Sequence, residues 1–354
     1  MDSQSIETVE EDLPHPDRNY PMDCWWVAAF AEEVGRNLLS RWILNMPIVM
    51  YRRADGTPVA IDDRCPHRSA PLSIGTLSGD NITCGYHGFE FGPDGKCVRI
   101  PTWRGVPPAR ANVRSYPVVE SGAFIWIYTG NLARIDDVPP PPTLEWMQND
   151  RFVVAKGRKD IAANYMLLKE NVLDLSHFGY VHAKTLKITD IVDAPEVTVE
   201  GDKVTYTQAF EAAPLSPLYG EPMGIPPGKP ISRVNQGSFV SPALQVAAVD
   251  FHDAAPDPGR PERYSVRVCH ATTPIDASHM HYWWATGRDY GTHQGAVEQL
   301  TTIIDRAFEE DRVVIEAIQR TMDRDPRRKE VSVPADAAGV QARRALQRWL
   351  AREA

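Results

Sequence analysis

Short apolar runs alternate with turn dipeptides along the first third of the chain. Between residues 38 and 130 these runs are WILNMPIVMYRRADGTPVAID, FEFGPDGKCVRI and YPVVESGAFIWIYTG. The bends within them carry Asp55-Gly56, Asp94-Gly95 and Ser121-Gly122. Because glycine readily adopts the positive φ of tight hairpin turns, this pattern predicts a compact all-β domain.

The pattern changes after the segment DDVPPPPTLEW, which places four prolines at 139–142. Consecutive prolines fit neither a helix interior nor a central strand, so they predict a stiff connector and a domain boundary near residue 140. Beyond it, periodicity predicts a helix at 162–178, a long helix from about 294 to 322, and strands in EVTVEGDKVTYTQAF and ERYSVRVCHATTPI. We therefore predict an α+β fold, with helices packed against an antiparallel sheet in the second domain.

Composition and charge narrow the classes of partner. The chain has 354 residues, 43% hydrophobic content and a formal net charge of -9. A nucleic-acid surface requires clustered Lys and Arg, so we expect no nucleic-acid partner. Apolar runs such as FIWIY at 124–128 are too short to span a membrane, and the acidic start MDSQSIETVEEDLPHPD does not resemble a signal peptide. We expect a cytoplasmic protein that does not bind membranes, with a disordered tail at 1–19.

The cysteines fall into two groups. Five cysteines in a chain of this length do not form a disulfide framework, and a reducing compartment favours metal or catalytic roles for clustered ones. Cys24, Cys97 and Cys269 stand outside any motif, so we predict that they are small core residues. Each of the other two has a histidine close by in the sequence.

The stretch CPHRSAPLSIGTLSGDNITCGYHG, residues 65–88, contains these two mixed pairs. One residue separates Cys65 from His67, two separate Cys84 from His87, and sixteen lie between the pairs. Zinc also binds Cys2His2 sets, but its usual spacings pair cysteine with cysteine and histidine with histidine. Mixed pairs in glycine-flanked loops of a β domain favour a [2Fe-2S] cluster, with two Cys on one iron and two His on the other.

A second group of polar residues occurs in NYMLLKENVLDLSHFGYVH, residues 164–182. Asn171, Asp174 and His177 are three residues apart and share one helical strip. His182 comes five residues after His177, about 140° around an ideal helix. Both imidazoles can therefore meet one ion only if the helix bulges or ends near Gly179; otherwise they are partly buried polar residues at a helix end.

The long helix supplies a third candidate ligand. In HQGAVEQLTTIIDRAFEEDRVVIEAIQR the predicted buried seam consists of Leu, Ile, Ala, Asp, Val and Ile at positions 300, 304, 307, 311, 314 and 318. Glu309 and Glu310 lie off this seam and can be solvated. A buried carboxylate such as Asp311 requires a compensating cation or donor. Because two His and one carboxylate form the facial triad of non-haem Fe(II) oxygenases, we predict that His177, His182 and Asp311 bind a mononuclear iron.

Together these motifs resemble the terminal oxygenase component of the Rieske non-haem iron oxygenases, in the group that includes vanillate O-demethylase and dicamba monooxygenase. The resemblance runs from about residue 20 to the end, through DCWWVAAFAEEV, the cluster loops, the N-x2-D-x2-H-x4-H motif and EEDRVVIEAI. It implies an all-β Rieske [2Fe-2S] domain at 20–138 and a helix-grip catalytic domain with mononuclear iron at 139–354.

The resemblance also implies partners. No G-x-G-x-x-G fingerprint opens a βαβ unit here, so electrons from NAD(P)H are expected through a separate reductase, directly or by way of a ferredoxin. The family assembles as a head-to-tail homotrimer. In it Asp174 would bridge subunits by accepting hydrogen bonds from the cluster ligand His87 and from an iron-ligand His of the next subunit. Asn171 would lie beside the iron without being a firm ligand.

The substrate is predicted less directly. On a loose alignment, Asn235 and His270 fall where dicamba-type enzymes anchor their substrate; otherwise Asn235 caps a turn and His270 is a core histidine. The resemblance predicts O2-dependent O-demethylation, with release of formaldehyde, or hydroxylation of a small methoxy- or methyl-substituted aromatic acid, by mono- or dioxygenation. The alternative function is an electron carrier, in which a Rieske domain is fused to a binding module without catalytic iron.

Overall fold

The computed structural model describes residues 20–191 and 193–353. The predicted disordered tail at 1–19 lies outside this part of the chain. Within it, no helix combines the length and the apolarity that crossing a bilayer requires.

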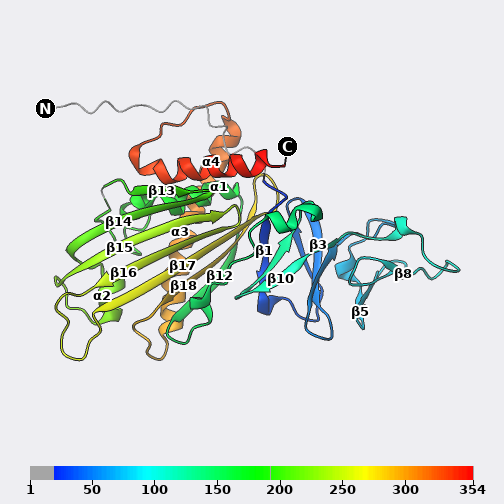
Figure 1. Ribbon diagram of the computed structural model, residues 1–354, viewed down its shortest axis with the longest axis horizontal. Helices are drawn as coiled ribbons and strands as arrows, with labels where there is room; N and C mark the ends of the chain where they lie inside the picture. Colours follow the sequence, from blue (N-terminus) through cyan, green and yellow to red (C-terminus); the bar gives the residue numbers. More distant parts are fainter. Residues whose placement is uncertain (1–19, 192, 354) are drawn as a thin grey trace.

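The N-terminal region consists of three small antiparallel sheets (Figure 1), with strand orders β1-β11-β10, β2-β3-β4-β9 and β5-β6-β7-β8. The strands are β1 Trp25–Phe30, β2 Leu39–Ile43, β3 Met46–Arg52, β4 Pro58–Asp62, β5 Thr76–Ser78, β6 Asn81–Thr83, β7 Glu90–Phe91, β8 Cys97–Arg99, β9 Ser115–Tyr116, β10 Val118–Ser121 and β11 Phe124–Tyr128. The predicted turn glycines Gly56, Gly95 and Gly122 all have positive φ, at 89°, 77° and 61°. The all-β prediction for this region is confirmed.

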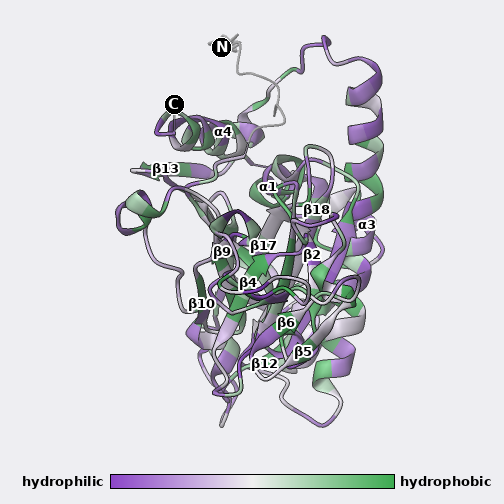
Figure 2. Ribbon diagram, turned by 90° about the vertical axis from the view of Figure 1, so that its right-hand side faces the viewer, coloured by the Kyte–Doolittle hydropathy of each residue, from purple (hydrophilic) through white to green (hydrophobic). Residues whose placement is uncertain are grey.

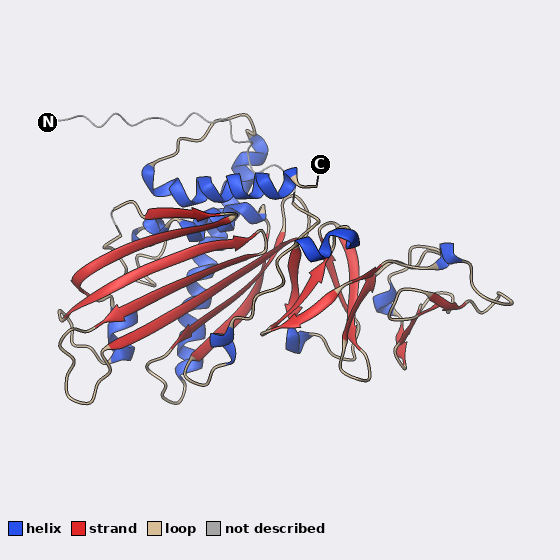
Figure 3. Ribbon diagram, viewed as in Figure 1, coloured by secondary structure: helices blue, strands red, loops and turns tan. Residues whose placement is uncertain are grey.

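The C-terminal region is built on one seven-stranded antiparallel sheet, in the order β12-β18-β17-β16-β15-β14-β13. Its strands are β12 Val153–Ile161, β13 Glu196–Glu200, β14 Lys203–Pro214, β15 Pro230–Ser241, β16 Leu244–His252, β17 Arg263–Pro274 and β18 Met280–Arg288. The helices are α1 Tyr165–Leu173, α2 Pro217–Met223, α3 Ala296–Arg324 and α4 Ala337–Ala351. Figure 3 shows α3 crossing the sheet and α4 lying along the β13 edge, which confirms the α+β prediction.

Two helical predictions need correction. The segment 162–178 is not one helix, because α1 ends at Leu173 and a 3₁₀ helix, η6 Leu175–Gly179, follows. The break therefore falls at Asp174 rather than near Gly179. The Asp174 side chain accepts a hydrogen bond of 2.8 Å from the Ser176 N–H, which caps the new turn and starts it in a different direction.

The buried seam of α3 also differs from the prediction at its C-terminal end. Asp311 is buried as predicted, but Val314 and Ile318 are 37% and 39% exposed, and Ile315 is the buried residue instead. At 3.6 residues per turn the position after 311 on the same face is 315, so the predicted spacing drifted off the face. Figure 2 shows both hydrophilic and hydrophobic residues along the length of α3, which agrees with a helix that buries one side. Helix α4 was not predicted.

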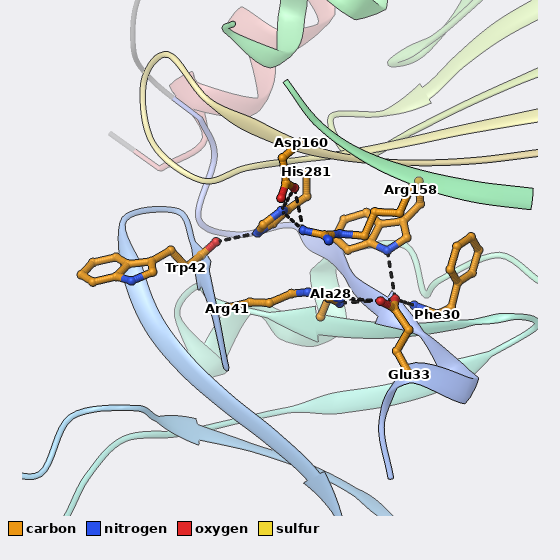
Figure 4. A network of polar contacts seen from close by, with 9 residues as sticks. Ala28, Phe30, Glu33, Arg41, Trp42, Arg158, Asp160 and His281 are labelled. Carbon is orange, nitrogen blue, oxygen red and sulfur yellow. Dashed lines mark hydrogen bonds and ion pairs between the residues drawn. The ribbon is translucent and has the colours of Figure 1, made fainter. Parts of the chain in front are cut away.

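The two regions are joined by polar contacts as well as by a shared apolar core. Glu33, between β1 and β2, pairs with Arg41 at 2.5 Å and accepts a hydrogen bond of 3.2 Å from the Trp283 indole of β18 (Figure 4). On the same side, His281 Nε2 lies 3.0 Å from the Trp42 carbonyl oxygen. These contacts hold the N-terminal sheets against the β12–β18 end of the seven-stranded sheet.

Residues 139–144 form neither helix nor strand, and β12 begins at Val153. The three cysteines predicted as core residues, Cys24, Cys97 and Cys269, are all buried. A division of the chain into domains at 138/139 stays a prediction.

Candidate metal centres and active-site cavity

The two loops that contain the Cys and His pairs have the same backbone structure. In each, the cysteine N–H donates to the carbonyl five residues later, and the fourth residue donates back to the cysteine carbonyl. These bonds are Cys65 to Ala70 at 2.8 Å, Ser69 to Cys65 at 2.9 Å, Cys84 to Phe89 at 2.7 Å and Gly88 to Cys84 at 3.1 Å. Ser69 and Gly88 occupy the same place in their loops and both have positive φ, at 57° and 71°.

This loop structure places the two kinds of candidate ligand, thiols and imidazoles, on different sides of the site. Cys65 and Cys84 are buried neighbours, whereas His67 and His87 are exposed with ring centroids 4.5 Å apart. Two thiols on the inner side and two imidazoles on the outer side suit a [2Fe-2S] cluster with one iron bound by cysteines and the other by histidines.

The second predicted group also converges. His177 belongs to η6, His182 lies in the turn after it, and Asp311 lies on α3. The Nε2 atoms of the two histidines are 3.5 and 3.2 Å from Asp311 Oδ1, and one ligand atom from each residue lies within 4.8 Å of the others. His177 Nε2 is buried and has no hydrogen-bond partner in the described chain. A buried nitrogen lone pair without a donor, beside a second imidazole and a carboxylate, fits a metal ion.

The Nδ1 atoms of both histidines are held by acceptors. His177 Nδ1 donates to the Asp174 carbonyl oxygen at 2.6 Å, and His182 Nδ1 donates to Glu310 Oε2 at 2.9 Å. Glu310 also accepts a hydrogen bond from Thr185 Oγ1. Because these acceptors cannot donate, each ring presents Nε2 to the shared space, as a metal-binding imidazole does.

The pKa values of the two imidazoles differ in direction. Burial lowers the pKa of His177. Burial acts in the same sense on His182, but hydrogen bonds and charges from Asp311 and Glu310 outweigh it and raise the pKa of that residue. Glu310 was predicted to be solvated, and its contact with His182 was missed because the spacing along α3 gives no sign of a partner 128 residues away.

Asn171 and Asp174 lie at the same site. Asn171 Nδ2 donates to Asp311 Oδ1 at 3.2 Å, while its own side-chain oxygen is buried without a partner in the residues described. Asp174 holds His177 through its backbone carbonyl, and its carboxylate caps η6. A contact with His87 of another subunit is not part of a single chain and stays a prediction.

A cavity of about 120 Å³ opens beside this site, between α3 and the sheet. The walls are mostly apolar, and the strands contribute small residues such as Ala247 and Ala248. Both predicted substrate residues line it. Asn235 lies within β15 and its side-chain oxygen is buried without a partner among the described residues, so the interpretation as a turn cap is wrong.

His270 lies within β17 and its Nδ1 is 2.8 Å from the Tyr282 hydroxyl. Burial lowers the pKa of His270 to about 4, so its imidazole is neutral at pH 7. It can take part in hydrogen bonds within the cavity, but it carries no charge.

The two arginines of the cavity were missed from the sequence, Arg233 on β15 and Arg288 at the end of β18. A usable signal was present for Arg288. It ends the run MHYWWATGR, which is otherwise nearly free of charge, and every residue of that strand is buried. A cation in such a strand requires a compensating group.

The Rieske [2Fe-2S] domain profile matches residues 24–117, and the profile of the vanillate O-demethylase oxygenase C-terminal domain matches residues 161–352. The chain is 34% identical to the iron–sulfur subunit of a toluene-4-sulfonate monooxygenase system from Comamonas testosteroni, over 94% of this chain and 97% of that protein. It is 33% identical to a vanillate O-demethylase oxygenase subunit from a Pseudomonas species, over 94% and 96%.

Among solved structures, dicamba monooxygenase bound to dicamba superimposes with a TM-score of 0.82 at 29% identity, covering 95% of this chain and 99% of that one. The Rieske profile matches the N-terminal region, and iron-bound dicamba monooxygenase shares the fold, so a Rieske cluster and a mononuclear iron belong to this protein too. The chain therefore belongs to the Rieske non-haem iron oxygenases, in the group that carries the vanillate O-demethylase oxygenase C-terminal domain.

Proposed function

We propose that this oxygenase component O-demethylates or hydroxylates a small methoxy- or methyl-substituted aromatic acid. The observation that carries the proposal is the convergence of His177, His182 and Asp311 at the wall of an apolar cavity. An electron carrier has no use for such a site. The proposed ligands of the mononuclear iron are these three residues, and those of the cluster are Cys65, His67, Cys84 and His87.

The reaction balances as R–OCH3 + O2 + 2e⁻ + 2H⁺ → R–OH + HCHO + H2O. When bound, the cluster supplies electrons one at a time and the mononuclear iron activates O2. The apolar walls exclude water and pack against the aromatic ring, while Asn235 and His270 orient the polar groups of the substrate by hydrogen bonding. Asn171 donates to Asp311 and so holds that carboxylate toward the two imidazoles.

The electrons come from NAD(P)H through a separate reductase, directly or through a ferredoxin, which is supported by the relatives being components of multicomponent systems. The exposure of His67 and His87 supports an electron path that leaves the cluster at the protein surface. In the proposed homotrimer, this path crosses to Asp174 of a neighbouring subunit. Five free cysteines support a cytoplasmic location, where thiols stay reduced.

The test is a coupled assay of NADH consumption and formaldehyde release over methoxybenzoates, their methyl esters and neutral amides, with iron content measured on the same preparation. We expect about three iron atoms per chain, two in the cluster and one at the mononuclear site. We also expect formaldehyde in proportion to NADH for the acids. Two irons per chain after anaerobic reconstitution, with no turnover of any substrate, would instead support the electron carrier.

A further inference from the structure

The distribution of charge in the cavity distinguishes two buried arginines. Arg233 and Arg288 are 3% and 5% exposed, and both line the cavity. A buried guanidinium is strongly destabilising unless a carboxylate or a bound anion compensates it.

Arg233 is compensated within the protein. Its Nη2 lies 3.0 Å from both carboxylate oxygens of Asp190, and its guanidinium lies 4.1 Å from the ring centroid of Phe210. The charge of Arg233 is therefore compensated within the protein, although its Nε, like that of Arg288, is buried without a partner among the described residues.

Arg288 has no carboxylate within 4.0 Å among the described residues. Its contacts are a 3.4 Å hydrogen bond from Nη2 to the Gly291 carbonyl and the face of Tyr290 at 5.6 Å, and its Nε is buried without a partner. The adjacent Asp289 points its carboxylate elsewhere, 2.7 Å from Arg151. Burial lowers the pKa of Arg288, the direction expected for a cation that lacks a counter-charge.

A second polar atom without a partner lies next to it. Thr286 also lines the cavity, its Oγ1 is buried and unpaired in the described chain, and two residues along a strand bring both side chains to the same face. Two buried polar atoms without partners in one wall, Arg288 Nε and Thr286 Oγ1, point to a ligand that hydrogen-bonds with both.

Strand register places this pair away from the metal site. His270 pairs with Trp284 and Val266 with Arg288, so Arg288 lies four residues along β18 from the level of His270, roughly 13 Å at about 3.3 Å per residue. His270 packs on Phe308, the residue one turn before Asp311 on α3, which puts it at the metal end. The arginine is at the other end of the cavity.

We propose that Arg288, with Thr286 as a second donor, binds the acid group of the substrate and selects anionic aryl carboxylates or sulfonates whose reacting substituent is meta or para. Asn235 and the neutral His270 offer hydrogen bonds but no charge. An ortho substituent holds the acid beside the reacting carbon, whereas a meta or para substituent lets one ring reach both ends of the cavity. This inference rests on the proposed function and adds to it the residue that selects the anion.

The test compares wild-type holoenzyme with Arg288→Met, Arg288→Gln and Arg288→Lys. The matched control is Arg267→Met, because Arg267 is adjacent in register on β17, points to the other face of the sheet and pairs with Asp250 at 2.8 Å. Dissociation constants and KM are measured for 4-methoxybenzoate, 4-methoxybenzenesulfonate and the neutral 4-methoxybenzamide, and thermal melting confirms that each variant is folded.

We expect Arg288→Met and Arg288→Gln to weaken binding of the acids by about 30-fold or more, while binding of the amide changes by less than about 3-fold. Arg288→Lys should restore most of the acid binding, and Arg267→Met should leave all three ligands unchanged. Whichever of the two acids loses more affinity in Arg288→Met and Arg288→Gln identifies the acid group, carboxylate or sulfonate, that Arg288 binds in the natural substrate. Equal losses for acid and amide would overturn the inference, because they indicate a structural role for Arg288.

The two proposals fail differently. If the wild type binds and oxidises the amide as well as the acids, the acid specificity of the proposed function is wrong. If the wild type prefers the acids and folded Arg288→Gln retains that preference, only the role of Arg288 is wrong. A preference for 2-methoxybenzoate over the 4-methoxy isomer would overturn the meta or para geometry.

Discussion

The two metal centres are built in different ways from the same chain. The proposed cluster ligands lie within 23 residues, from Cys65 to His87, on two loops whose own backbone hydrogen bonds give them their shape. The proposed mononuclear site combines His177 and His182 with Asp311, more than a hundred residues away on α3. Local hydrogen bonds therefore determine the first centre, whereas the packing of α3 on the large sheet determines the second.

This difference predicts how each centre responds to change. A site built from one local segment depends on the ligands within that segment and is insensitive to distant packing. A site assembled by tertiary structure depends also on residues that only orient its ligands, such as Glu310 and Asp174.

The largest expected effect separates the two centres completely. Asp311→Ala and His177→Ala should each lower turnover by about 10³-fold or more, because a ligand at the reacting iron is lost. The visible and paramagnetic spectra of the cluster should not change. Cys84→Ser should do the opposite, with loss of the cluster spectrum and retention of the mononuclear iron. Loss of the cluster signal in Asp311→Ala would show that the centres are not independent.

The next effect tests the orientation of a ligand by its neighbour. Glu310→Gln keeps an acceptor for His182 Nδ1 but removes the charge, so iron affinity or activity should fall by about 10- to 100-fold. Glu309→Gln is the matched control, because Glu309 lies next to it on α3 and pairs instead with Arg312 at 2.5 Å. Similar losses in both variants would mean that helix charge matters rather than the contact with His182.

The same distinction explains what the sequence could and could not predict. The cluster loops were predictable because ligand spacing and flanking glycines within one segment carry the information. Asp311 was predictable because a carboxylate interrupts an apolar seam. The contact of Glu310 with His182 was missed because it depends on which residue another element brings near α3. Arg288 was missed although a cation in a strand nearly free of charge was a usable signal.

The helix break at Asp174 shows the limit of periodicity more directly. Spacing indicated that some break was required for His177 and His182 to meet, and pointed to Gly179 as the flexible position. The structure places it at Asp174, since a capping hydrogen bond to Ser176 stabilises the new turn more effectively than backbone freedom alone. Helix α4 was missed although its buried residues Ala338, Ala342, Ala345 and Trp349 follow helical spacing.

A third test concerns the packed core beneath the mononuclear site. This core shapes the C-terminal region, whereas the cluster loops are shaped by their own hydrogen bonds. Lys169 on α1 is fully buried and its Nζ has no hydrogen-bond partner in the described residues. Burial lowers the pKa of Lys169 to about 7, below its value of 10.5 in an unfolded chain. Between these values the unfolded chain binds more protons, so stability should rise with pH, by at most about 1.4 kcal/mol per unit.

The rise of stability with pH ends near pH 9. Burial raises the pKa of the neighbouring Cys24 and Cys269 thiols, so above that pH the unfolded chain loses their protons first and stability falls. Lys169→Met should be at least as stable as the wild type at pH 7 and should lose the slope between pH 7 and pH 8.5. Denaturant unfolding at a series of pH values measures both. An unchanged slope in Lys169→Met would assign the pH dependence to other groups.

The smallest effect uses the likeness between the two cluster loops. Ser69 and Gly88 occupy equivalent positions with positive φ, but only one of them is glycine. Gly88→Ala should destabilise the N-terminal region by about 1 kcal/mol, from the left-handed backbone and from a Cβ only 3.1 Å from Pro101 Cγ. Ser69→Gly should relieve the same backbone strain and change stability by a few tenths of a kcal/mol or more in the opposite direction, against the greater entropy of the unfolded glycine.

Both variants should keep the cluster, since neither residue is a ligand, and both should leave the mononuclear site unaffected. Melting followed by the cluster absorbance measures the pair; a loss of iron from the His177 site in either variant would contradict the separation of local and tertiary control.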